Sequence, residues 1–322
     1  MFALRGFAVF LSIFFVLYAA LSLAVVVLWR WVWLSARPYS ARFCADLLFL
    51  LRVTPFLVST AFTLALAVPS FLLLEPRAVD EGMGTAPVLL GLCGIAVMLA
   101  GTWQATTALM QAAKLRARWL RRDSSVGLAS GMVYGGGSIP VYRILEAAPP
   151  LTTTGILRPG VWLSHAAESL LTRSELETAL RHELAHVHRR DNLRKLILRF
   201  AAFPGLAELD RVWAMCAEMA ADDAAVTNAC QALDLAAAVI KLSRLAPAEL
   251  PAQLTTALVH GPAKALHERV TRLLEWAERP QQPKHLCWPY VLCSVAALAA
   301  TLILPYNQLL VRIHILTEWL VR

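Results

Sequence analysis

Charged residues are scarce in this sequence. Only 16% of its 322 residues are Asp, Glu, Lys or Arg, whereas 58% are hydrophobic. Soluble globular domains carry about 25% charged and about 45–50% apolar residues. The scarcity of charge therefore excludes an ordinary soluble domain and indicates that much of the chain lies in an apolar environment.

The chain also lacks paired cysteines and any clear nucleotide-binding or nucleic-acid-binding motif. Its six cysteines form no C-x-x-C pair, which argues against a disulfide framework or a cysteine zinc site. The glycines at 135–137 are not followed by the G-K-S/T of a phosphate-binding loop. The net charge is +8, but no basic recognition motif accompanies it. We therefore expect no direct nucleic-acid binding and assign the basic residues to lipid contact and topology.

Long uncharged runs are present instead. Each of them is long enough to cross a hydrocarbon core of about 30 Å as a helix. The first run is too long for a signal-peptide core and is followed by tryptophans where a cleavage site would need small residues. We therefore predict four retained transmembrane helices, in the uncharged runs at 7–29, 53–74, 85–110 and 286–311.

Lys and Arg residues orient these helices. They are frequent after the first and third runs, so the positive-inside rule places residues 111–285 in the cytoplasm and both termini outside it. The oligomeric state is not fixed by these features, and a homodimer is one option. The predicted organisation is a three-helix transmembrane region at 1–110, a cytoplasmic domain at 111–285, a fourth transmembrane helix at 286–306 and a short extracytoplasmic tail at 307–322.

The cytoplasmic segment begins with short strands and continues as helices. Its glycine- and proline-rich first part favours strands at about 139–145 and 156–163. Its second part has helical hydrophobic spacing, which predicts an α+β domain. After a first helix that starts near residue 172, further helices are expected at about 192–202, 206–229, 231–245 and 264–278.

An H-E-x-x-H pattern is the most informative feature of that first helix. His182 and His186 are four positions apart and project about 40° from each other on a helix, so both can reach one metal ion. Glu183 is offset by about 100° and lies beside the metal, where it can take a proton from a zinc-bound water. Thr172 and Glu175 form a capping box that predicts the helix start.

A catalytic zinc site needs a third protein ligand and one open position. The Gly and His that a metzincin would have after the second histidine are absent, so we assign the third ligand to Glu218 on a later helix. Asp222 lies one turn beyond Glu218, and we expect it to accept a hydrogen bond from a ligating histidine. The pattern thus predicts one catalytic Zn²⁺ ion, held by His182, His186 and Glu218.

These residues predict a zinc metalloendopeptidase. The metal would polarise a peptide carbonyl, and Glu183 would accept a proton from the attacking water and return it to the leaving amine. A non-proteolytic membrane transducer with a structural zinc site is the alternative. A closed structural site has no need of a base, which favours the peptidase.

Several segments together resemble the BlaR/MecR-type membrane zinc metallopeptidases. The resemblance runs from the first to the fourth predicted span and is most specific over 154–223. It is carried by H-E-L-A-H with Arg-Arg-Asp at 189–191, Glu218 with Ala221 and Asp222, T-G-I-L-R-P-G-V-W-L at 154–163, and E-R-V-x-x-L-L at 268–274.

The resemblance implies a mainly α protein of the bacterial cytoplasmic membrane, with a gluzincin-like α+β domain inserted between transmembrane helices 3 and 4. It also implies signalling proteolysis, in which the enzyme inactivates a cytoplasmic transcriptional repressor or cleaves itself. Receptors of this family carry a penicillin-binding sensor domain after the fourth span. Here only about residues 306–322 follow, without an S-x-x-K motif, so we expect no β-lactam acylation. A housekeeping membrane protease of the HtpX or CAAX-processing type is a further alternative.

Substrate-contacting residues are harder to assign. Ile156, Val161 and Leu163 could belong to an exposed edge strand that pairs with substrate, or to an internal strand. Arg269 could line the cleft, as the family resemblance implies, or lie on a helix surface. His260 and His267 are the candidates for stabilising an oxyanion.

The charged residues that follow the second histidine are ambiguous in the same way. We expect His188 to lie on the helix surface, because it is two positions beyond His186. Residues 189–191 could engage substrate, but we prefer a structural role at the helix end. Asp223 is expected to be solvated, unlike its neighbour Asp222.

Overall fold

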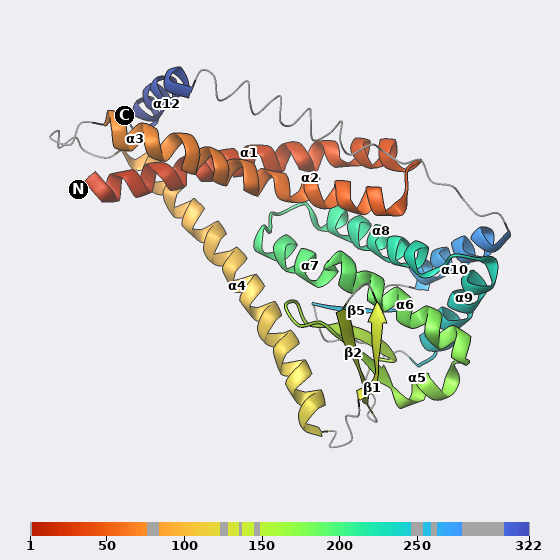
Figure 1. Cartoon of the computed structure of the whole chain (residues 1–322). Coiled ribbons are helices and arrows are strands. Elements are labelled where there is room, and N and C mark those ends of the chain that lie inside the picture. Colours follow the sequence, from red (N-terminus) through yellow and green to blue (C-terminus); the bar gives the residue numbers. More distant parts are fainter. Residues whose placement is uncertain are drawn as a thin grey trace.

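The chain is mainly helical and contains one small sheet (Figure 1). The computed structural model describes residues 2–75, 84–122, 128–134, 137–144, 149–245, 254–258, 263–278 and 306–321. A pair of long helices runs along one side, a third long helix diverges from them, and the sheet and the shorter helices lie between (Figure 1).

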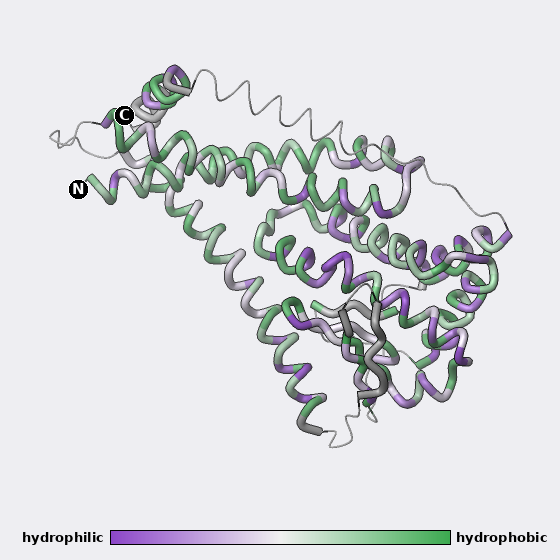
Figure 2. Tube along the Cα trace, in the orientation of Figure 1, coloured by the Kyte–Doolittle hydropathy of each residue, from purple (hydrophilic) through white to green (hydrophobic). Residues whose placement is uncertain are grey.

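Three helices are long and apolar enough to cross a membrane, by length and composition. They are α1 (Phe2–Ala36), α2 (Ala41–Phe62) with its continuation to Leu74, and α4 (Thr85–Arg122). The continuation of α2 consists of the π-helix η1 (Thr63–Ala67) and α3 (Val68–Leu74). These helices form the hydrophobic part of the molecule (Figure 2).

The predicted fourth span at 286–306 lies almost entirely outside the described residues. The last described helix, α12 (Tyr306–Val321), packs against α3, where the Ser70 hydroxyl donates a hydrogen bond of 2.9 Å to the Leu310 carbonyl. The two ends of the chain therefore lie near the same end of the membrane helices (Figure 1).

Two glycines let α4 approach its neighbours closely. A Cβ atom at Gly94 would lie 2.7 Å from the Leu11 carbonyl oxygen of α1, and one at Gly101 would lie 2.1 Å from the Phe200 carbonyl oxygen. Both distances are far below van der Waals contact, so a larger residue would push the helices apart. Small residues are the usual device for such close helix packing in membranes.

Within the described residues, the sheet and six further helices cover positions 128–278. The sheet has the order β1-β2-β4-β3-β5, in which β2 and β4 are parallel and the other neighbours are antiparallel. The strands are β1 (Leu128–Tyr134), β2 (Gly137–Ile144), β3 (Leu151–Thr154), β4 (Gly160–Ser164) and β5 (Thr255–Ala257), and the helices are α5 (His165–Leu170), α6 (Arg173–Arg189), α7 (Asp191–Phe200), α8 (Ala207–Ala225), α9 (Ala229–Ser243) and α10 (Ala263–Glu278).

The strand topology distinguishes the two interpretations of residues 156–163, an exposed edge strand and an internal strand. Val161 and Leu163 are buried on β4, which lies between β2 and β3 and has no free edge for a substrate. Ile156 lies in the loop before β4 and is half-buried. The internal-strand interpretation is therefore correct for β4, because both of its edges are paired, one with β2 and the other with β3. Both β3 and β4 contribute residues to the core beneath α6 and α9.

Helix α6, which carries the H-E-x-x-H pattern, begins as the sequence predicts. The Thr172 side chain accepts a hydrogen bond from the Glu175 amide, and the Glu175 carboxylate accepts one of 2.8 Å from the Thr172 amide. Lys241 of α9 also donates to the Glu175 carboxylate, at 2.7 Å. The helix start is therefore fixed both locally and by a neighbouring helix.

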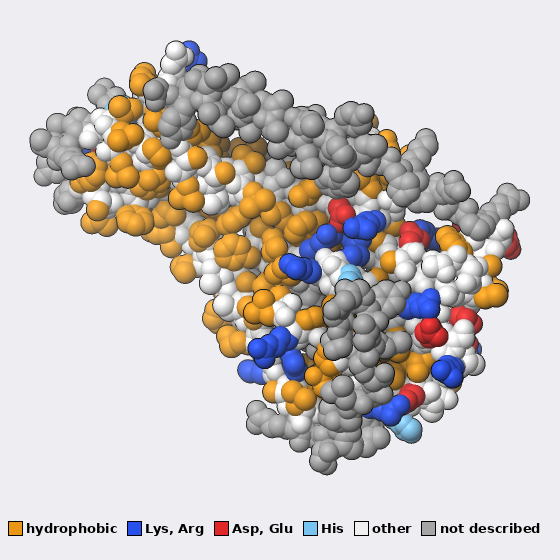
Figure 3. Space-filling model, in the orientation of Figure 1, with side chains coloured by type: hydrophobic (Ala, Val, Ile, Leu, Met, Phe, Trp, Pro, Cys, Tyr) orange, Lys and Arg blue, Asp and Glu red, His pale blue; other side chains and the backbone are white. Residues whose placement is uncertain are grey.

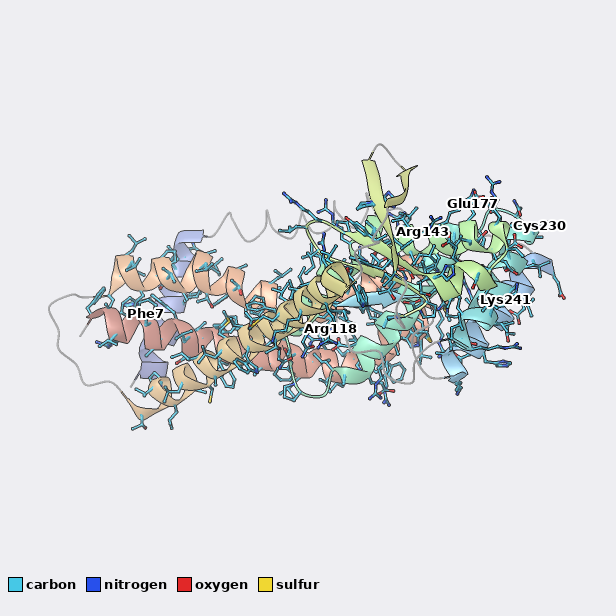
Figure 4. All side chains as sticks on the ribbon, turned by 90° about the horizontal axis from the view of Figure 1, so that it is seen from below. Phe7, Arg118, Arg143, Glu177, Cys230 and Lys241 are labelled. Carbon is cyan, nitrogen blue, oxygen red and sulfur yellow. The ribbon has the colours of Figure 1, made fainter. Side chains whose placement is uncertain are left out.

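The long apolar helices pack directly on the shorter helices. Leu48 of α2 is completely buried in a cluster that includes Trp213 and Ala217 of α8. The surface changes from apolar to mixed charge across this junction (Figure 3). Phe7 lies at the far end of the membrane helices, and Glu177 and Lys241 lie at the opposite end of the molecule (Figure 4).

Arg52 joins α2 to α7 and α8. Its guanidinium is 2% exposed and donates to the Asp210 carboxylate at 3.0 Å and to the Ala201 and Leu198 carbonyls at 2.6 and 3.4 Å. The last carbonyls of a helix have no partner within the helix. Arg52 supplies donors for these carbonyls of α7 and so ties the end of α7 to a membrane helix.

Replacement of Leu48 by Ala tests this junction. We expect a loss of about 2–5 kcal/mol in the free energy of unfolding, because the side chain is fully buried and leaves a cavity. The measurement is denaturant unfolding in detergent micelles. Leu50→Ala is the matched control, since Leu50 is 42% exposed, and should change stability by about 0.5 kcal/mol or less. Equal losses in the two variants would contradict the assignment.

Candidate metal centre

Three side chains converge between α6 and α8. The Nε2 atoms of His182 and His186 are 3.2 Å apart; His182 Nε2 lies 3.5 Å from Glu218 Oε2, and His186 Nε2 lies 3.5 Å from the other oxygen, Oε1. Both histidines are buried, and Glu218 is 16% exposed. The structure thus contains a three-residue group that could hold a metal ion.

The spacing of these atoms fits a tetrahedral metal site. Zn²⁺ binds histidine nitrogens and carboxylate oxygens at about 2.0–2.2 Å, so two ligand atoms of a tetrahedron are about 3.3–3.5 Å apart. The observed separations of 3.2 and 3.5 Å fall close to this range. The Glu218 carboxylate is also 3.1 Å from the guanidinium of Arg269 through Oε2, so its negative charge is partly balanced within the protein.

Each histidine is oriented by a carboxylate on its other ring nitrogen. His182 Nδ1 lies 2.8 Å from an Asp222 oxygen, an ion-pair contact between the two side chains. His186 Nδ1 lies 2.7 Å from Asp191, and both carboxylates are 1% exposed. Such partners fix the tautomer, so that both Nε2 atoms present lone pairs to a common point.

The position of Asp191 depends on one unusual backbone conformation. Arg190, between α6 and α7, is left-handed with φ 55° and ψ 40°. A non-glycine residue in this region costs about 1–2 kcal/mol. The turn starts α7 immediately after α6 and brings Asp191 back beside His186, so the strained residue serves the site.

Glu183 has one oxygen that is held and one that is unpaired. The Thr153 hydroxyl of β3 donates a hydrogen bond of 2.6 Å to Glu183 Oε2, whereas Oε1 is buried and unpaired within the described part of the chain. Complete burial raises the pKa of Glu183, although the histidines and Thr153 partly offset the increase. A raised pKa suits a carboxylate that must accept a proton near neutral pH.

The electrostatic field at the centre favours a cation. Burial opposes protonation of His186, but the carboxylates of Glu218 and Asp191 outweigh it and raise the pKa to about 10. Burial alone would raise the pKa of Glu218. The positive charges of His186 and Arg269 outweigh this effect and hold the pKa well below its usual value. Positive charge is thus strongly favoured between these groups, whether it is carried by protons or by a metal.

Arg269 holds two of the carboxylates of the centre in place. It is 3% exposed and donates two hydrogen bonds to Asp222, of 2.9 and 2.6 Å, and one of 2.8 Å to the Leu258 carbonyl. Its Nη1 also lies 3.1 Å from Glu218. The guanidinium therefore neutralises both carboxylates and lies inside the protein, neither on a helix surface nor open to solvent.

The other residues considered for substrate binding or oxyanion stabilisation differ in their placement and exposure. Ile156 lines a cavity of about 20 Å³ together with His186, which keeps it near the site. His188 is exposed, as predicted, and so is His267 on α10. His260 lies outside the described residues.

The sequence analysis missed three groups at the centre. Asp191 was assigned to the helix end, and Thr153 was not considered. Lys195 of α7 was also missed; burial lowers its pKa, while the nearby carboxylates of Glu218 and Asp191 counteract the change. Asp191 had a usable signal, an acidic residue five positions after the second histidine, but only the turn at Arg190 reveals its role.

Replacement of Arg269 by Met tests the contribution of its buried pair with Asp222. We expect a loss of about 3–5 kcal/mol in the free energy of unfolding, because Asp222 would keep a buried charge without its main counterion. Arg272→Met is the matched control on the same helix. Its pair with Asp223 is partly exposed, with side chains 26% and 32% accessible, so the loss should be about 0–1 kcal/mol. The measurement is denaturant unfolding of both variants. A loss of stability for Arg269→Met as small as that for Arg272→Met would contradict a buried, charge-balancing role of Arg269.

Comparison with other proteins adds no family assignment to this geometry. No protein-family model matches the chain, and no curated protein matches it by sequence.

Proposed function

We propose that the chain is an integral-membrane zinc metalloendopeptidase. The observation that carries the proposal is the convergence of His182, His186 and Glu218 with the buried carboxylate of Glu183 on the same turn of α6. Two imidazoles and one carboxylate form a typical ligand set of a hydrolytic zinc site. A purely structural site would not require the unpaired oxygen of Glu183.

The proposed reaction is hydrolysis of a peptide bond. When bound, zinc would lower the pKa of a coordinated water and polarise the substrate carbonyl. Glu183 would accept the proton of the attacking water and deliver it to the leaving nitrogen. Thr153 keeps the Glu183 carboxylate in place through Oε2 and leaves Oε1 for the proton.

Asp222 and Asp191 contribute by orientation. Each holds one histidine by Nδ1 and stabilises positive charge on that imidazole. Arg269 keeps Asp222 and Glu218 ionised at neutral pH, so the ligand carboxylate does not have to lose a proton before it binds metal.

The substrate and the biological setting are part of the same proposal. Four membrane spans with a gluzincin-like domain on the cytoplasmic side would give the enzyme access to cytoplasmic proteins. A transcriptional repressor or the chain itself fits this setting. The contacts of α2 with α7 and α8 support a signalling role, because a shift of α2 would act on the helices that carry Asp191 and Glu218.

Glu183→Gln tests the proposed base. We expect proteolysis to fall by about 10²–10⁴-fold, the usual contribution of general acid–base catalysis, while bound zinc is retained. The measurement compares newly formed protein termini in cells that express the wild type or the variant, together with the zinc content of the purified proteins.

The control is Glu177→Gln, two turns earlier on the exposed face of α6, where the side chain is 50% accessible. This variant should cleave like the wild type. Undiminished cleavage by Glu183→Gln would reject the mechanism, and absence of zinc from the wild type would reject the metal centre.

Proton release tests the metal site independently of any substrate. Because the pKa of His186 is raised to about 10 in the metal-free centre, this histidine is protonated at neutral pH and must lose a proton to bind Zn²⁺. Apparent zinc affinity should therefore increase with pH, about tenfold per pH unit for each displaced proton.

The measurement is isothermal titration calorimetry at pH 7 in two buffers with different ionisation enthalpies. His188→Ala is the control and should release the same number of protons, because this histidine is exposed. Equal binding heats in the two buffers, or an affinity that does not change with pH, would show that the site is not the one described.

A further inference from the structure

A second cavity lies outside the metal centre. It has a volume of about 450 Å³, and α2, α6, α7 and α8 all contribute residues to its wall. Leu184 and His188 of α6 face this cavity, whereas His182 and His186 face the metal centre. The charged residues of the wall are Arg42, Asp46, Arg181, Arg189, Arg190 and Arg194.

Arg189 is the least satisfied of these arginines. Its side chain is 9% exposed, and Nε, Nη1 and Nη2 all lack a hydrogen-bond acceptor in the described part of the structure. The nearest carboxylate oxygens belong to Asp191 and Asp46, at 3.5 and 3.9 Å. A guanidinium has five N–H donors, and burying them unpaired is unfavourable.

The two nearby carboxylates are already engaged. Asp46 accepts a hydrogen bond of 2.6 Å from Arg194, and Asp191 lies 2.7 Å from His186 through its other oxygen. Arg181 is paired with Glu177 at 2.7 Å. The wall therefore keeps an excess of positive charge that its own acidic residue cannot neutralise.

The cavity lies at the boundary of the apolar surface. Arg42 and Asp46 are in the first two turns of α2, and Leu50, one turn further, is 42% exposed. Trp31, near the end of α1, is 73% exposed. Figure 3 shows Lys and Arg side chains gathered beside the apolar surface, in the region where α2 and α7 meet in Figure 1.

We propose that this cavity binds a phosphate group through Arg189 and the arginines around it. The oxygens of a phosphate match the fork of a guanidinium, and several arginines neutralise its charge together. The group could belong to the headgroup of an anionic lipid, which the position at the membrane boundary favours, or to a free phosphate. The cavity is large enough for a headgroup and is separate from the proposed catalytic site.

Calorimetric titration of the full-length protein with inorganic phosphate tests the proposal. The protein is reconstituted in nanodiscs of phosphatidylcholine, with chloride as a control at matched ionic strength. We expect saturable phosphate binding, weakened about tenfold in Arg189→Gln through loss of the charged fork. Arg42→Gln, an exposed position, should weaken binding about threefold. Arg244→Gln, an exposed arginine at the end of α9, should leave it unchanged.

Nanodiscs that also contain phosphatidylglycerol distinguish the source of the group. Loss of phosphate binding in these discs identifies the lipid headgroup as the occupant, and undiminished binding identifies free phosphate. No saturable binding in phosphatidylcholine discs would overturn the proposal. Binding that is the same in Arg42→Gln and the wild type would also overturn it, since the phosphate would then occupy another site such as the metal centre. If Arg189→Gln does not fold, phosphate binding by Arg42→Gln tests the proposal on its own.

Discussion

The contact between each histidine and its buried carboxylate is the interaction on which the centre depends. Asp222 and Asp191 hold the Nδ1 atoms of His182 and His186, so the two Nε2 atoms meet 3.2 Å apart. Two imidazole nitrogens at this distance repel each other when both present lone pairs, and a proton or a metal ion between them removes the repulsion. The helix spacing brings the rings together, and the carboxylates decide which nitrogens face the common point.

Buried charge is balanced differently at Arg269 and at Arg189. At the metal centre, Arg269 donates hydrogen bonds to Asp222 and a backbone carbonyl and also contacts Glu218, so its charge is compensated within the protein. Arg189, at the end of α6, is almost as buried, yet its donors have no acceptor among the described residues. Asp191 lies between the metal centre and Arg189, since one of its oxygens contacts His186 and the other is 3.5 Å from Arg189.

The long apolar helices are part of the architecture that positions these groups. Residues of α2, α7 and α8 share one hydrophobic cluster, and α4 also packs on α7. Arg52 joins them by polar contacts as well, since it donates to carbonyls at the end of α7 and to Asp210 at the start of α8. The ends of α7 and α8 are therefore tied to α2 by both apolar and polar contacts.

Local patterns in the sequence determined much of this description. The apolar runs predicted the three described membrane helices, the capping box predicted the start of α6, and the spacing within 182–186 placed both histidines on one face. These features depend on neighbours within a few positions, where helix geometry alone fixes the outcome. Tertiary structure decided the rest. The internal place of β4, the pairing of Arg269 with Asp222 and the turn at Arg190 that brings Asp191 to His186 depend on which elements pack together, and residue spacing does not encode that choice.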